Sequence, residues 1–253
     1  MSRIITRRGL LRRGALGAGG LLLAGCDPLD LSSPVPAFLR LGEAVAYHTH
    51  RLIGADSLAR EYEAAEMSPD FRTNGNTMPT SAAYRAEMAR GFAGWRLAVD
   101  GEVEKPGAYS LAELGNMPSR TQITRHDCVE GWSAIGQWTG VPLAVLLDQV
   151  RPKPGARYAV FHCADDFDGT AYYESIDMVD ARHKQTILAY AMNGRTLPVG
   201  HGAPLRLRVE RQLGYKQAKY VMRVEMVADL AAVRGGGGGF WEDTTGYDWY
   251  AGV

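Results

Sequence analysis

The stretch Thr124–Leu147, TRHDCVEGWSAIGQWTGVPLAVLL, places one cysteine beside a histidine and two acids, and follows it with two tryptophans and an apolar run. Its first residues are typical of the end of a strand. Residues 141–150, VPLAVLLDQV, predict a helix because apolar side chains recur at helical spacing behind Pro142. The stretch therefore predicts a strand and a helix joined through a segment that carries Cys128. What that cysteine does depends on the rest of the chain.

Seven segments of the chain alternate between apolar and other residues or are continuously apolar, which is the pattern of strands. They are residues 95–103, 120–126, 156–165, 170–178, 185–194, 203–210 and 220–230. Only short helices are predicted between them, one of which opens with a capping box formed by Ser110 and Glu113. The pattern predicts a β-rich α+β fold in a single domain and argues against a doubly wound parallel sheet.

Residues 1–26 combine five arginines with a short Gly/Ala/Leu run and no acid, which predicts an export signal rather than a membrane span. Residues 6–11, TRRGLL, resemble the twin-arginine export motif, and residues 23–26, LAGC, resemble a lipobox in which Cys26 carries the lipid. A general secretory signal, or cleavage near Cys26 without a lipid, are the alternatives. Because twin-arginine export moves folded proteins, the signal favours a cofactor inserted before export and a periplasmic location.

The remaining chain divides into three parts. Residues 27–70 are expected to form a polar tether and two N-terminal helices broken near Gly54. Residues 71–234 are expected to form the main domain, which starts with an irregular loop at 71–81. Residues 235–253 comprise a glycine run, expected to be a flexible hinge, and an aromatic tail that is expected to pack back on the domain.

The charge of the chain bears on its partners. There are 28 basic and 28 acidic residues, and five of the basic residues precede Cys26. The rest of the chain therefore has five more acidic than basic residues, which argues against nucleic acid as a partner.

The cysteines Cys128 and Cys163 leave several chemistries open. In an oxidising compartment they could form a disulfide. Together with His126 and His162 they could instead hold zinc or copper, although His162 and Cys163 point to opposite faces of a strand. A Cys/His nucleophile is a third alternative, for which the sequence offers no defined oxyanion hole.

Two blocks of sequence resemble one family. Residues 126–133, HDCVEGWS, with the GQWTGVPLAVLL that follows, resemble the cofactor segment of the sulfite oxidase family, whose C-V-E-x-W-S loop supplies one thiolate to molybdenum. Residues 197–227, LPVGHGAPLRLRVERQLGYKQAKYVMRVEMV, resemble that family's L-P-x-x-N/H-G-x-P-x-R-L block and its G-x-K-x-x-K continuation. The chain thus resembles an exported bacterial molybdopterin-dependent oxidoreductase, related to the catalytic subunit of periplasmic methionine sulfoxide reductase.

The resemblance implies a molybdenum–molybdopterin cofactor, in its nucleotide-free form, with Cys128 as the metal ligand. A thiolate is a soft anionic donor that suits high-valent molybdenum. The phosphate of the cofactor requires cations and backbone N–H groups. The candidates in the second block are Arg206, Lys216, Gln217, Ala218 and Lys219. The alternative is a solvated cationic face.

Other site residues follow from the same resemblance. His201 stands where the family has an asparagine or histidine that binds the pterin, and Cys163 stands near a threonine position at the pterin. Asn74 and Asn76 lie in the loop where related enzymes use an asparagine, although loop asparagines are commonly turn formers.

Two basic residues precede the cysteine. Arg125 and His126 could attract an oxyanion or stabilise charge during oxygen-atom transfer. Alternatively, they end a strand, with His126 hydrogen-bonded behind the metal site.

The expected activity is two-electron oxygen-atom transfer, either sulfite-type oxidation or sulfoxide-type reduction. A separate cytochrome is the expected redox partner, because the chain has no haem-attachment C-x-x-C-H motif. A monomer, anchored to the membrane only through Cys26, is expected. The alternative functions are a non-catalytic lipoprotein of the same fold with a Cys128–Cys163 disulfide, or a His/Cys zinc or copper site.

Overall fold

The computed structural model of the protein describes residues 35–253, with side chains from Leu41 onward. One compact unit spans Tyr47–Val253, and the residues before Tyr47 fall outside that unit. The export signal and lipobox expected in residues 1–26, and the start of the expected tether, lie outside the described residues. The compact unit begins earlier in the chain than residue 71, where the sequence suggested that the main domain starts.

The first described helix is α2 (Val35–Gly54), which ends at Gly54 as the sequence predicts. The second predicted helix, at 57–67, is wrong, because those residues hold only a 3-10 turn, η1 (Ala64–Glu66). The side chain of Gln185 binds both backbone groups of Ala59, at 2.8 and 3.0 Å, and the segment continues beside the second sheet. Contacts with distant residues therefore override the helical pattern of this segment.

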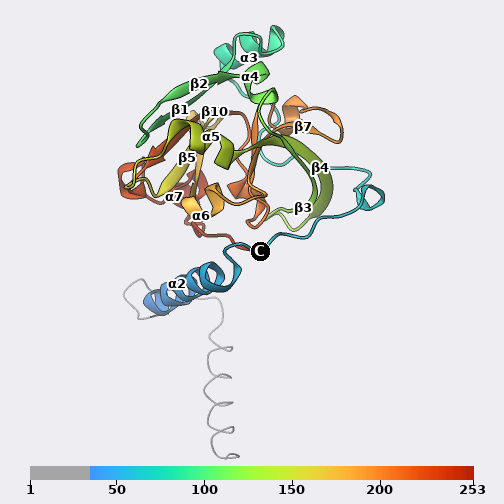
Figure 1. Cartoon of the computed structure of the whole chain (residues 1–253). Helices are drawn as coiled ribbons and strands as arrows, with labels where there is room; N and C mark the ends of the chain where they lie inside the picture. Colours follow the sequence, from blue (N-terminus) through green and yellow to red (C-terminus); the bar gives the residue numbers. More distant parts are fainter. Residues whose placement is uncertain (1–34) are drawn as a thin grey trace, which may run out of the picture. The chain divides into compact units, whose positions relative to one another are not determined.

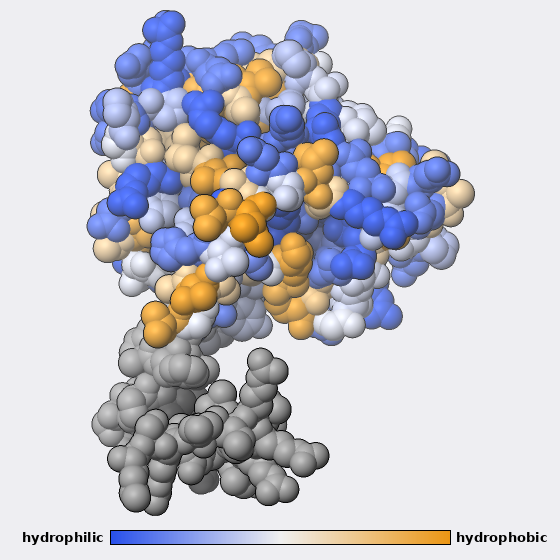
Figure 2. All heavy atoms as spheres, turned by 60° about the horizontal axis from the view of Figure 1, so that its bottom comes forward, coloured by the Kyte–Doolittle hydropathy of each residue, from blue (hydrophilic) through white to orange (hydrophobic). Residues whose placement is uncertain are grey.

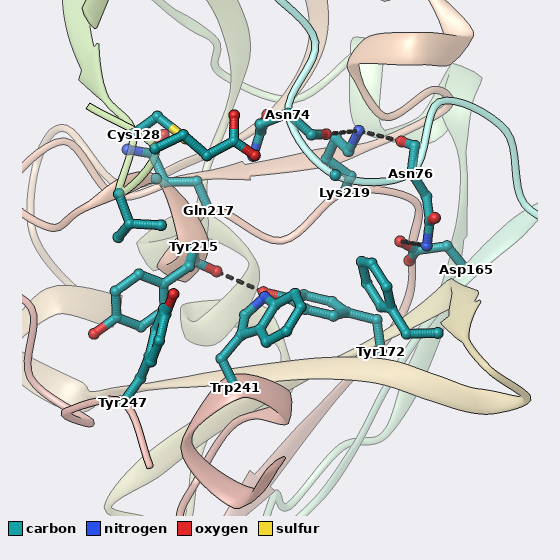
Figure 3. Close-up of a pocket in the computed structure, with 15 residues that line it drawn as sticks. Asn74, Asn76, Cys128, Asp165, Tyr172, Tyr215, Gln217, Lys219, Trp241 and Tyr247 are labelled. Carbon is teal, nitrogen blue, oxygen red and sulfur yellow. Dashed lines mark hydrogen bonds between the residues drawn. The ribbon is translucent and has the colours of Figure 1, made fainter. Parts of the chain in front are cut away.

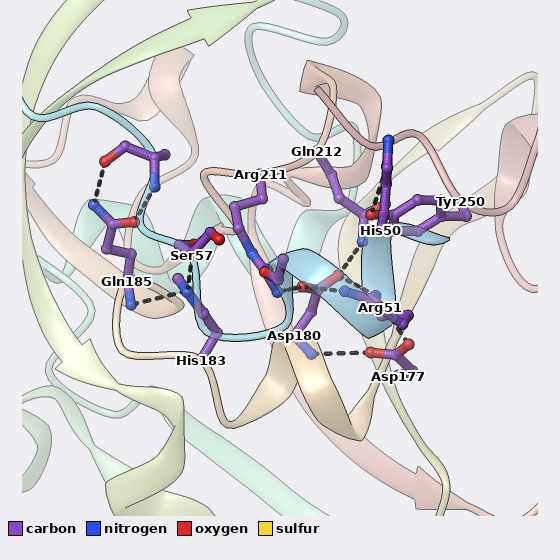
Figure 4. Close-up of polar contacts among 12 residues, drawn as sticks. His50, Arg51, Ser57, Asp177, Asp180, His183, Gln185, Arg211, Gln212 and Tyr250 are labelled. Atoms are coloured by element: carbon purple, nitrogen blue, oxygen red, sulfur yellow. Dashed lines mark hydrogen bonds and ion pairs between the residues drawn. The ribbon is translucent and has the colours of Figure 1, made fainter. Parts of the chain in front are cut away.

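Ion pairs fix the N-terminal segment, from Tyr47 onward, on the domain (Figure 4). Arg51 donates to both carboxylate oxygens of Asp180, at 3.0 and 2.7 Å, and also pairs with Asp177 at 2.9 Å. Arg211 donates to the same Asp180 at 2.6 Å. Because Asp177 and Asp180 are buried, removing either arginine would leave a poorly compensated carboxylate.

The first sheet has the strand order β2-β1-β10-β5-β6 (Figure 1). Its strands are β1 (Arg96–Gly101), β2 (Gly107–Ser110), β5 (Tyr158–Phe167), β6 (Thr170–Asp177) and β10 (Val221–Val227). β1 and β10 pair in parallel, with Val99 opposite Val224, and the other neighbours are antiparallel. The sheet therefore joins the beginning of the predicted domain to its end.

The second sheet has the order β3-β4-β7-β8, with β9 also paired to β7. Its strands are β3 (Arg120–Asp127), β4 (Ser133–Pro142), β7 (Ile187–Met192), β8 (Arg195–Thr196) and β9 (Arg206–Arg208). β4, which contains Gly136, Gly140 and Pro142, was not predicted from the sequence. It forms because it lies between β3 and β7 and hydrogen-bonds to both.

Short helices and 3-10 turns connect these strands. They are α3 (Ala82–Ala89), α4 (Leu111–Gly115), α5 (Leu143–Val150), α6 (Met178–Ala181), α7 (Phe240–Thr245), η2 (Val199–His201), η3 (Gly214–Lys216) and η4 (Leu230–Ala232). The predicted capping box begins α4: Glu113 N donates to Ser110 Oγ at 3.2 Å, and Ser110 N donates to Glu113 Oε2 at 2.7 Å. The β-rich α+β fold predicted from the sequence is confirmed.

Two clusters of buried apolar side chains form the core. The larger packs α5 and the inner residues of the first sheet together, and the smaller surrounds Phe71 and Trp138 beside the second sheet. On the face that Figure 2 draws, polar residues cover most of the surface and apolar residues gather across its middle and lower part. Among residues 35–253, no helix has both the length and the apolar character needed to cross a membrane.

Candidate active site

Cys128 lies in the loop that joins β3 to β4. The strands pair up to Asp127 and Ser133, and Cys128 N then donates to Trp132 O at 2.9 Å. Gly131 has φ of 85°, a conformation that favours glycine, and its N–H donates to Cys128 O at 3.0 Å. Trp132 Nε1 donates to Glu130 Oε2 at 3.0 Å. The thiol is therefore positioned by a short hydrogen-bonded loop at the end of a two-stranded hairpin.

Cys128 lines a pocket of about 190 Å³ (Figure 3). One set of lining residues is polar or charged: Asn74, Asn76, Glu130, Asp165, Gln217 and Lys219. Another set is aromatic: Phe167, Tyr172, Tyr215, Trp241 and Tyr247. Burial raises the pKa of the half-buried Cys128 thiol, while the nearby Arg206 acts to lower it. A bound cation would stabilise the thiolate further.

Lys219 presents its ammonium group at one side of this pocket. Its Nζ donates to Asn74 O at 2.6 Å, to Gly200 O at 3.0 Å and to Asn76 O. Burial, and then the charge of Arg206, lower the pKa of Lys219 to about 7. All three acceptors are neutral carbonyls, so the positive charge of Lys219 has no hydrogen-bonded carboxylate among the described side chains.

Arg206 lies behind Asn74 and is fully buried. It donates to His201 O at 3.1 Å and to Asn74 Oδ1 at 3.4 Å, and its guanidinium lies over the Trp138 ring at 5.2 Å. Its Nε has no hydrogen-bond partner within the described part of the chain. Burial, and then the neighbouring Arg208, lower the pKa of Arg206 to about 9.

These residues fit an anionic cofactor. Arg206 and Lys219 are buried cations whose hydrogen-bond partners are uncharged, and such an arrangement stabilises a bound anion. Gln217 also lines the pocket, while its Oε1 is buried, has no hydrogen-bond partner in residues 41–253 and lies on the side of the side chain that interacts with His126. Asp165 is a carboxylate whose charge acts on Lys219, and burial raises the pKa of Asp165 to about 6.

Arg125 and His126 lie on opposite faces of β3. Arg125 is exposed and pairs with Asp127 at 2.9 Å, whereas His126 is fully buried beside Phe71 and Trp132. Arg208 donates to His126 Nδ1 at 3.1 Å, and burial, with nearby arginines, sets the pKa of His126 well below its usual value. Neither residue lines the pocket, so the structure favours the alternative in which His126 lies behind the site.

His126 acts on the pocket through Gly214, which does line it. A Cβ atom at Gly214 would lie 2.6 Å from both Cε1 and Nε2 of His126. Glycine is therefore required for η3 to approach the histidine ring this closely. Arg208 in turn forms a buried bidentate pair with Glu210, at 2.9 and 2.6 Å, which holds the guanidinium against His126.

Three other candidates lie away from the pocket wall. Lys216 is fully buried between Glu174 and Glu242, so it faces away from a cofactor phosphate. Ala218 packs in the main core, and its carbonyl accepts from Leu207 N at 2.8 Å. Cys163 is buried, and its thiol donates to Phe161 O at 3.8 Å.

His201 is close to the cationic end of the site without lining the pocket. Its ring packs edge-on against Phe71 at 5.7 Å, and its carbonyl accepts from Arg206. Burial and the charges of Arg206 and Lys219 lower the pKa of His201 to about 4, so its ring is neutral at pH 7.

The structure does not support two of the alternatives that Cys128 and Cys163 left open, the disulfide and the zinc or copper site. Both Cys128 and Cys163 are free thiols, so the disulfide is not formed. No group of three or more His, Cys, Asp or Glu side chains among the described residues is arranged to hold a metal ion. The proposed zinc or copper site with His126 and His162 therefore has no structural basis, because His162 instead pairs with Glu225 at 2.8 Å.

Sequence reasoning missed the aromatic wall of the pocket. Tyr172 comes from β6, Tyr215 from η3, and Trp241 and Tyr247 from the C-terminal tail. The signal that could have found them was the unusual aromatic content of that tail, which suggested packing but not where. Gln217 and Lys219, which follow η3, were expected at the cofactor, and both line the pocket.

Comparisons with known proteins identify the family of this chain. Residues 85–232 match the family described as oxidoreductase molybdopterin binding domain. A protein-methionine-sulfoxide reductase subunit named YedZ1, from Azospira oryzae, is 38% identical over 248 residues, which cover 97% of this chain and 87% of that protein. The catalytic subunit MsrP of a protein-methionine-sulfoxide reductase from Xanthomonas campestris is 35% identical, over 88% of this chain and 70% of that protein.

One solved structure extends the comparison to the fold. The sulfane dehydrogenase SoxCD from Paracoccus pantotrophus is similar with a TM-score of 0.52 and 26% identity. The match covers 60% of this chain and 41% of the SoxCD chain. The resemblance to the sulfite oxidase family that the sequence predicted is thus confirmed. The chain belongs to the oxidoreductase molybdopterin-binding domain family, and it is a molybdopterin-dependent oxidoreductase whose cofactor is molybdenum–molybdopterin.

Proposed function

We propose that this protein is an exported enzyme that reduces sulfoxides by oxygen-atom transfer at a molybdenum ion bound by Cys128. The observation that carries the proposal is that one pocket joins a free thiol to the buried Lys219, with Arg206 buried behind Asn74, and that both cations donate only to uncharged groups. A thiolate and an anion site are the two features that molybdenum and a phosphorylated pterin require of a protein.

Each residue has a role in this proposal. Cys128 supplies the protein thiolate, and the hairpin loop fixes where its sulfur lies. Lys219 and Arg206 stabilise the phosphate and the negative charge of the cofactor, with Asn74 and Asn76 orienting Lys219 through their carbonyls. When bound, the molybdenum cofactor supplies a centre that exchanges one oxygen atom and two electrons.

Two further residues complete the pterin site in this proposal. Gln217 lines the pocket and would contact the pterin there. His201 remains neutral near Arg206, so its ring can bind the pterin without adding a third positive charge. Behind them, the Arg208–Glu210 pair and His126 keep η3 in place.

The pocket favours a neutral sulfoxide over sulfite. Apart from Lys219, its lining has no cationic side chain, and Glu130 and Asp165 add acidic groups. An oxyanion such as sulfite would need cations of its own beside the metal. A sulfoxide carries no net charge, and its reduction consumes two electrons and two protons to give a thioether and water. The names of the two methionine-sulfoxide reductase relatives support the same direction.

The electrons and the location belong to the same proposal. The sequence has no haem-attachment motif, so a separate cytochrome would deliver the electrons. It would deliver them one at a time. The twin-arginine and lipobox patterns support export to the periplasm with a lipid at Cys26. The enzyme would act as a monomer.

The test combines composition with turnover. Protein made in a molybdate-replete host is analysed for molybdenum and pterin, and one of each per chain is expected. The holoenzyme is then assayed with reduced methyl viologen and N-acetylmethionine sulfoxide, and separately with sulfite and an oxidised cytochrome. Consumption of the sulfoxide without sulfite oxidation supports the proposal. Sulfite oxidation alone would overturn the direction, and folded protein without pterin would overturn the whole proposal.

A further inference from the structure

Two of the five aromatic residues that line the pocket, Trp241 and Tyr247, come from the C-terminal tail. Trp241 and Tyr247 stack on each other with ring centres 6.1 Å apart, and Tyr247 meets Tyr215 edge-on at 5.1 Å. Phe167 packs against Trp241 at 5.1 Å. Tyr247 is 40% exposed, so this wall reaches from the interior of the pocket to solvent.

Buried ion pairs hold this wall in place. Glu242, the residue after Trp241, pairs with Lys216 at 2.7 Å, and Lys216 is the residue after Tyr215. Lys216 also pairs with Glu174 of β6. α7 and η3 are thus clamped together by their inward side chains, while the neighbouring Trp241 and Tyr215 line the pocket.

Hydrogen bonds fix the tyrosines further. Tyr215 Oη donates to Asp248 O at 2.5 Å, and Tyr172 Oη donates to Tyr215 O at 2.6 Å. The hydroxyl of Tyr215 is therefore used within the tail rather than in the pocket. Its ring is presented as an apolar surface, with little rotational freedom left to lose when a ligand binds.

Part of the wall lies on the Cys128 side of the pocket. Figure 3 shows Tyr215 and Tyr247 on the same side as Cys128, whereas Lys219, Asn76 and Asp165 lie on the other side. Val129, the residue after Cys128, also lines the pocket and is 44% exposed, which extends the apolar surface next to the thiol. The cationic side suits the phosphate, and the aromatic side is left for a group without charge.

We propose that Tyr215, Trp241 and Tyr247 form a subsite that binds the apolar substituent of a sulfoxide while its S=O group faces the metal site. Sulfur and methyl groups pack favourably against aromatic rings, so the subsite favours thioether sulfoxides with a bulky apolar arm. The C-terminal tail is then a specificity element of the enzyme. The class of ligand rests on the proposed function, but the placement of the wall does not.

The test uses a matched pair of tail variants in the holoenzyme. Trp241→Leu and Tyr247→Leu alter the wall, and Tyr250→Leu is the control. Tyr250 lies in the same tail but packs on Tyr47 and Arg51, outside this pocket (Figure 4). The equilibrium dissociation constants of benzyl methyl sulfoxide and dimethyl sulfoxide are measured calorimetrically on the oxidised enzyme, along with molybdenum and pterin content and KM.

The expected result is selective. Each wall variant weakens benzyl methyl sulfoxide binding by up to about tenfold, with a smaller effect on dimethyl sulfoxide and little change in kcat. The Tyr250→Leu control leaves both dissociation constants and the cofactor content unchanged.

Two results would overturn the subsite. Unchanged binding of benzyl methyl sulfoxide in both wall variants shows that the rings do not contact the ligand. Loss of pterin from those variants, with the control intact, assigns the wall to the cofactor. A wild-type enzyme that binds the sulfoxides but never reduces them overturns the proposed function instead, and the binding constants of the variants still decide the subsite.

Discussion

Lys216 and Lys219 are three residues apart, yet their ammonium groups occupy opposite kinds of environment. Lys216 Nζ is enclosed by two carboxylates, Glu174 and Glu242, with none of its side chain exposed. Lys219 Nζ binds the carbonyls of Asn74, Asn76 and Gly200 at the pocket. One lysine neutralises buried acids, and the other carries a charge available to a ligand.

Replacing each lysine by methionine separates the two roles. Lys219→Met removes a charge-assisted contact worth about 1.5–3 kcal/mol, so we expect pterin retention to weaken by about tenfold to a hundredfold with a small effect on folding. Lys216→Met leaves two buried acids without their cation and is expected to destabilise the fold by about 3–5 kcal/mol. Pterin content and urea unfolding measure the two effects. If the two variants lost the same amount of pterin and had the same free energy of unfolding, the separate roles assigned to the two lysines would be contradicted.

The two cysteines offer a second comparison. Cys128→Ser is expected to abolish thiolate-to-molybdenum absorption and to lower turnover by more than about a hundredfold, because a serine is a harder and more weakly ionised donor. Cys163→Ala is expected to keep the absorption band and cost about 1 kcal/mol of stability, because its thiol is buried away from the pocket. Visible spectra and turnover of both variants provide the measurement. A band that survives in Cys128→Ser would exclude Cys128 as the ligand.

The pKa of Lys219 predicts how anion binding depends on pH. In the cofactor-free protein its pKa is lowered to about 7, so its ammonium is charged below pH 7 and neutral above it. Arg206 stays charged, because its pKa of about 9 is higher, and Asp165 loses its charge below about pH 6. Sulfate, which does not titrate in this range, is expected to bind more weakly as pH rises through 7, with proton uptake on binding at pH 8.

The same shift has a consequence for stability. Between pH 7 and the unfolded value of 10.5, the unfolded chain holds a proton on Lys219 that the folded cofactor-free protein lacks. This group therefore makes the cofactor-free protein more stable as pH rises across that window.

The sulfate prediction is tested with Lys219→Met. In this variant, calorimetric sulfate titrations from pH 6 to 9 should lose the step near pH 7. Persistence of the step would assign it to Asp165, whose pKa is raised to about 6 and whose charge also acts on this lysine.

Gly214 tests the link between His126 and the pocket. Gly214→Ala places a methyl group 2.6 Å from the His126 ring, and we expect a loss of about 1–3 kcal/mol in unfolding free energy with weaker pterin retention. Gly155→Ala is the control, because nothing lies within 4 Å of a Cβ atom there. Urea unfolding with pterin analysis decides between them. If Gly214→Ala behaves like the control, the histidine does not constrain η3.

Local patterns in the sequence were enough for most of the strands. The period-two alternation of residues 95–103 and 120–126 appears as β1 and β3, because burial of one face of a sheet selects every second side chain. The pattern failed at residues 57–67, where the side chain of Gln185 hydrogen-bonds both backbone groups of Ala59. It also did not predict β4, which contains glycines and is stabilised by hydrogen bonds to its neighbours β3 and β7.

The sequence also predicted part of the site. Asn74, Asn76, Cys128, Gln217 and Lys219 were expected at the cofactor, and all five line the pocket. Lys216 and Ala218 belong to the same short block but point elsewhere, because the backbone after η3 follows no regular period. A motif fixes which residues are neighbours in the chain, but it does not fix the direction of each side chain.

By itself, the sequence determined the β-rich fold class and the family, since these are written in side-chain periodicity and in contiguous motifs. Only the tertiary structure decided which cations face the pocket and where the aromatic tail lies. Both depend on contacts between residues distant in the chain, such as the pair between Lys216 and Glu242, 26 residues apart. Burial makes an unpaired charge costly, and that cost selects one arrangement that no local pattern records.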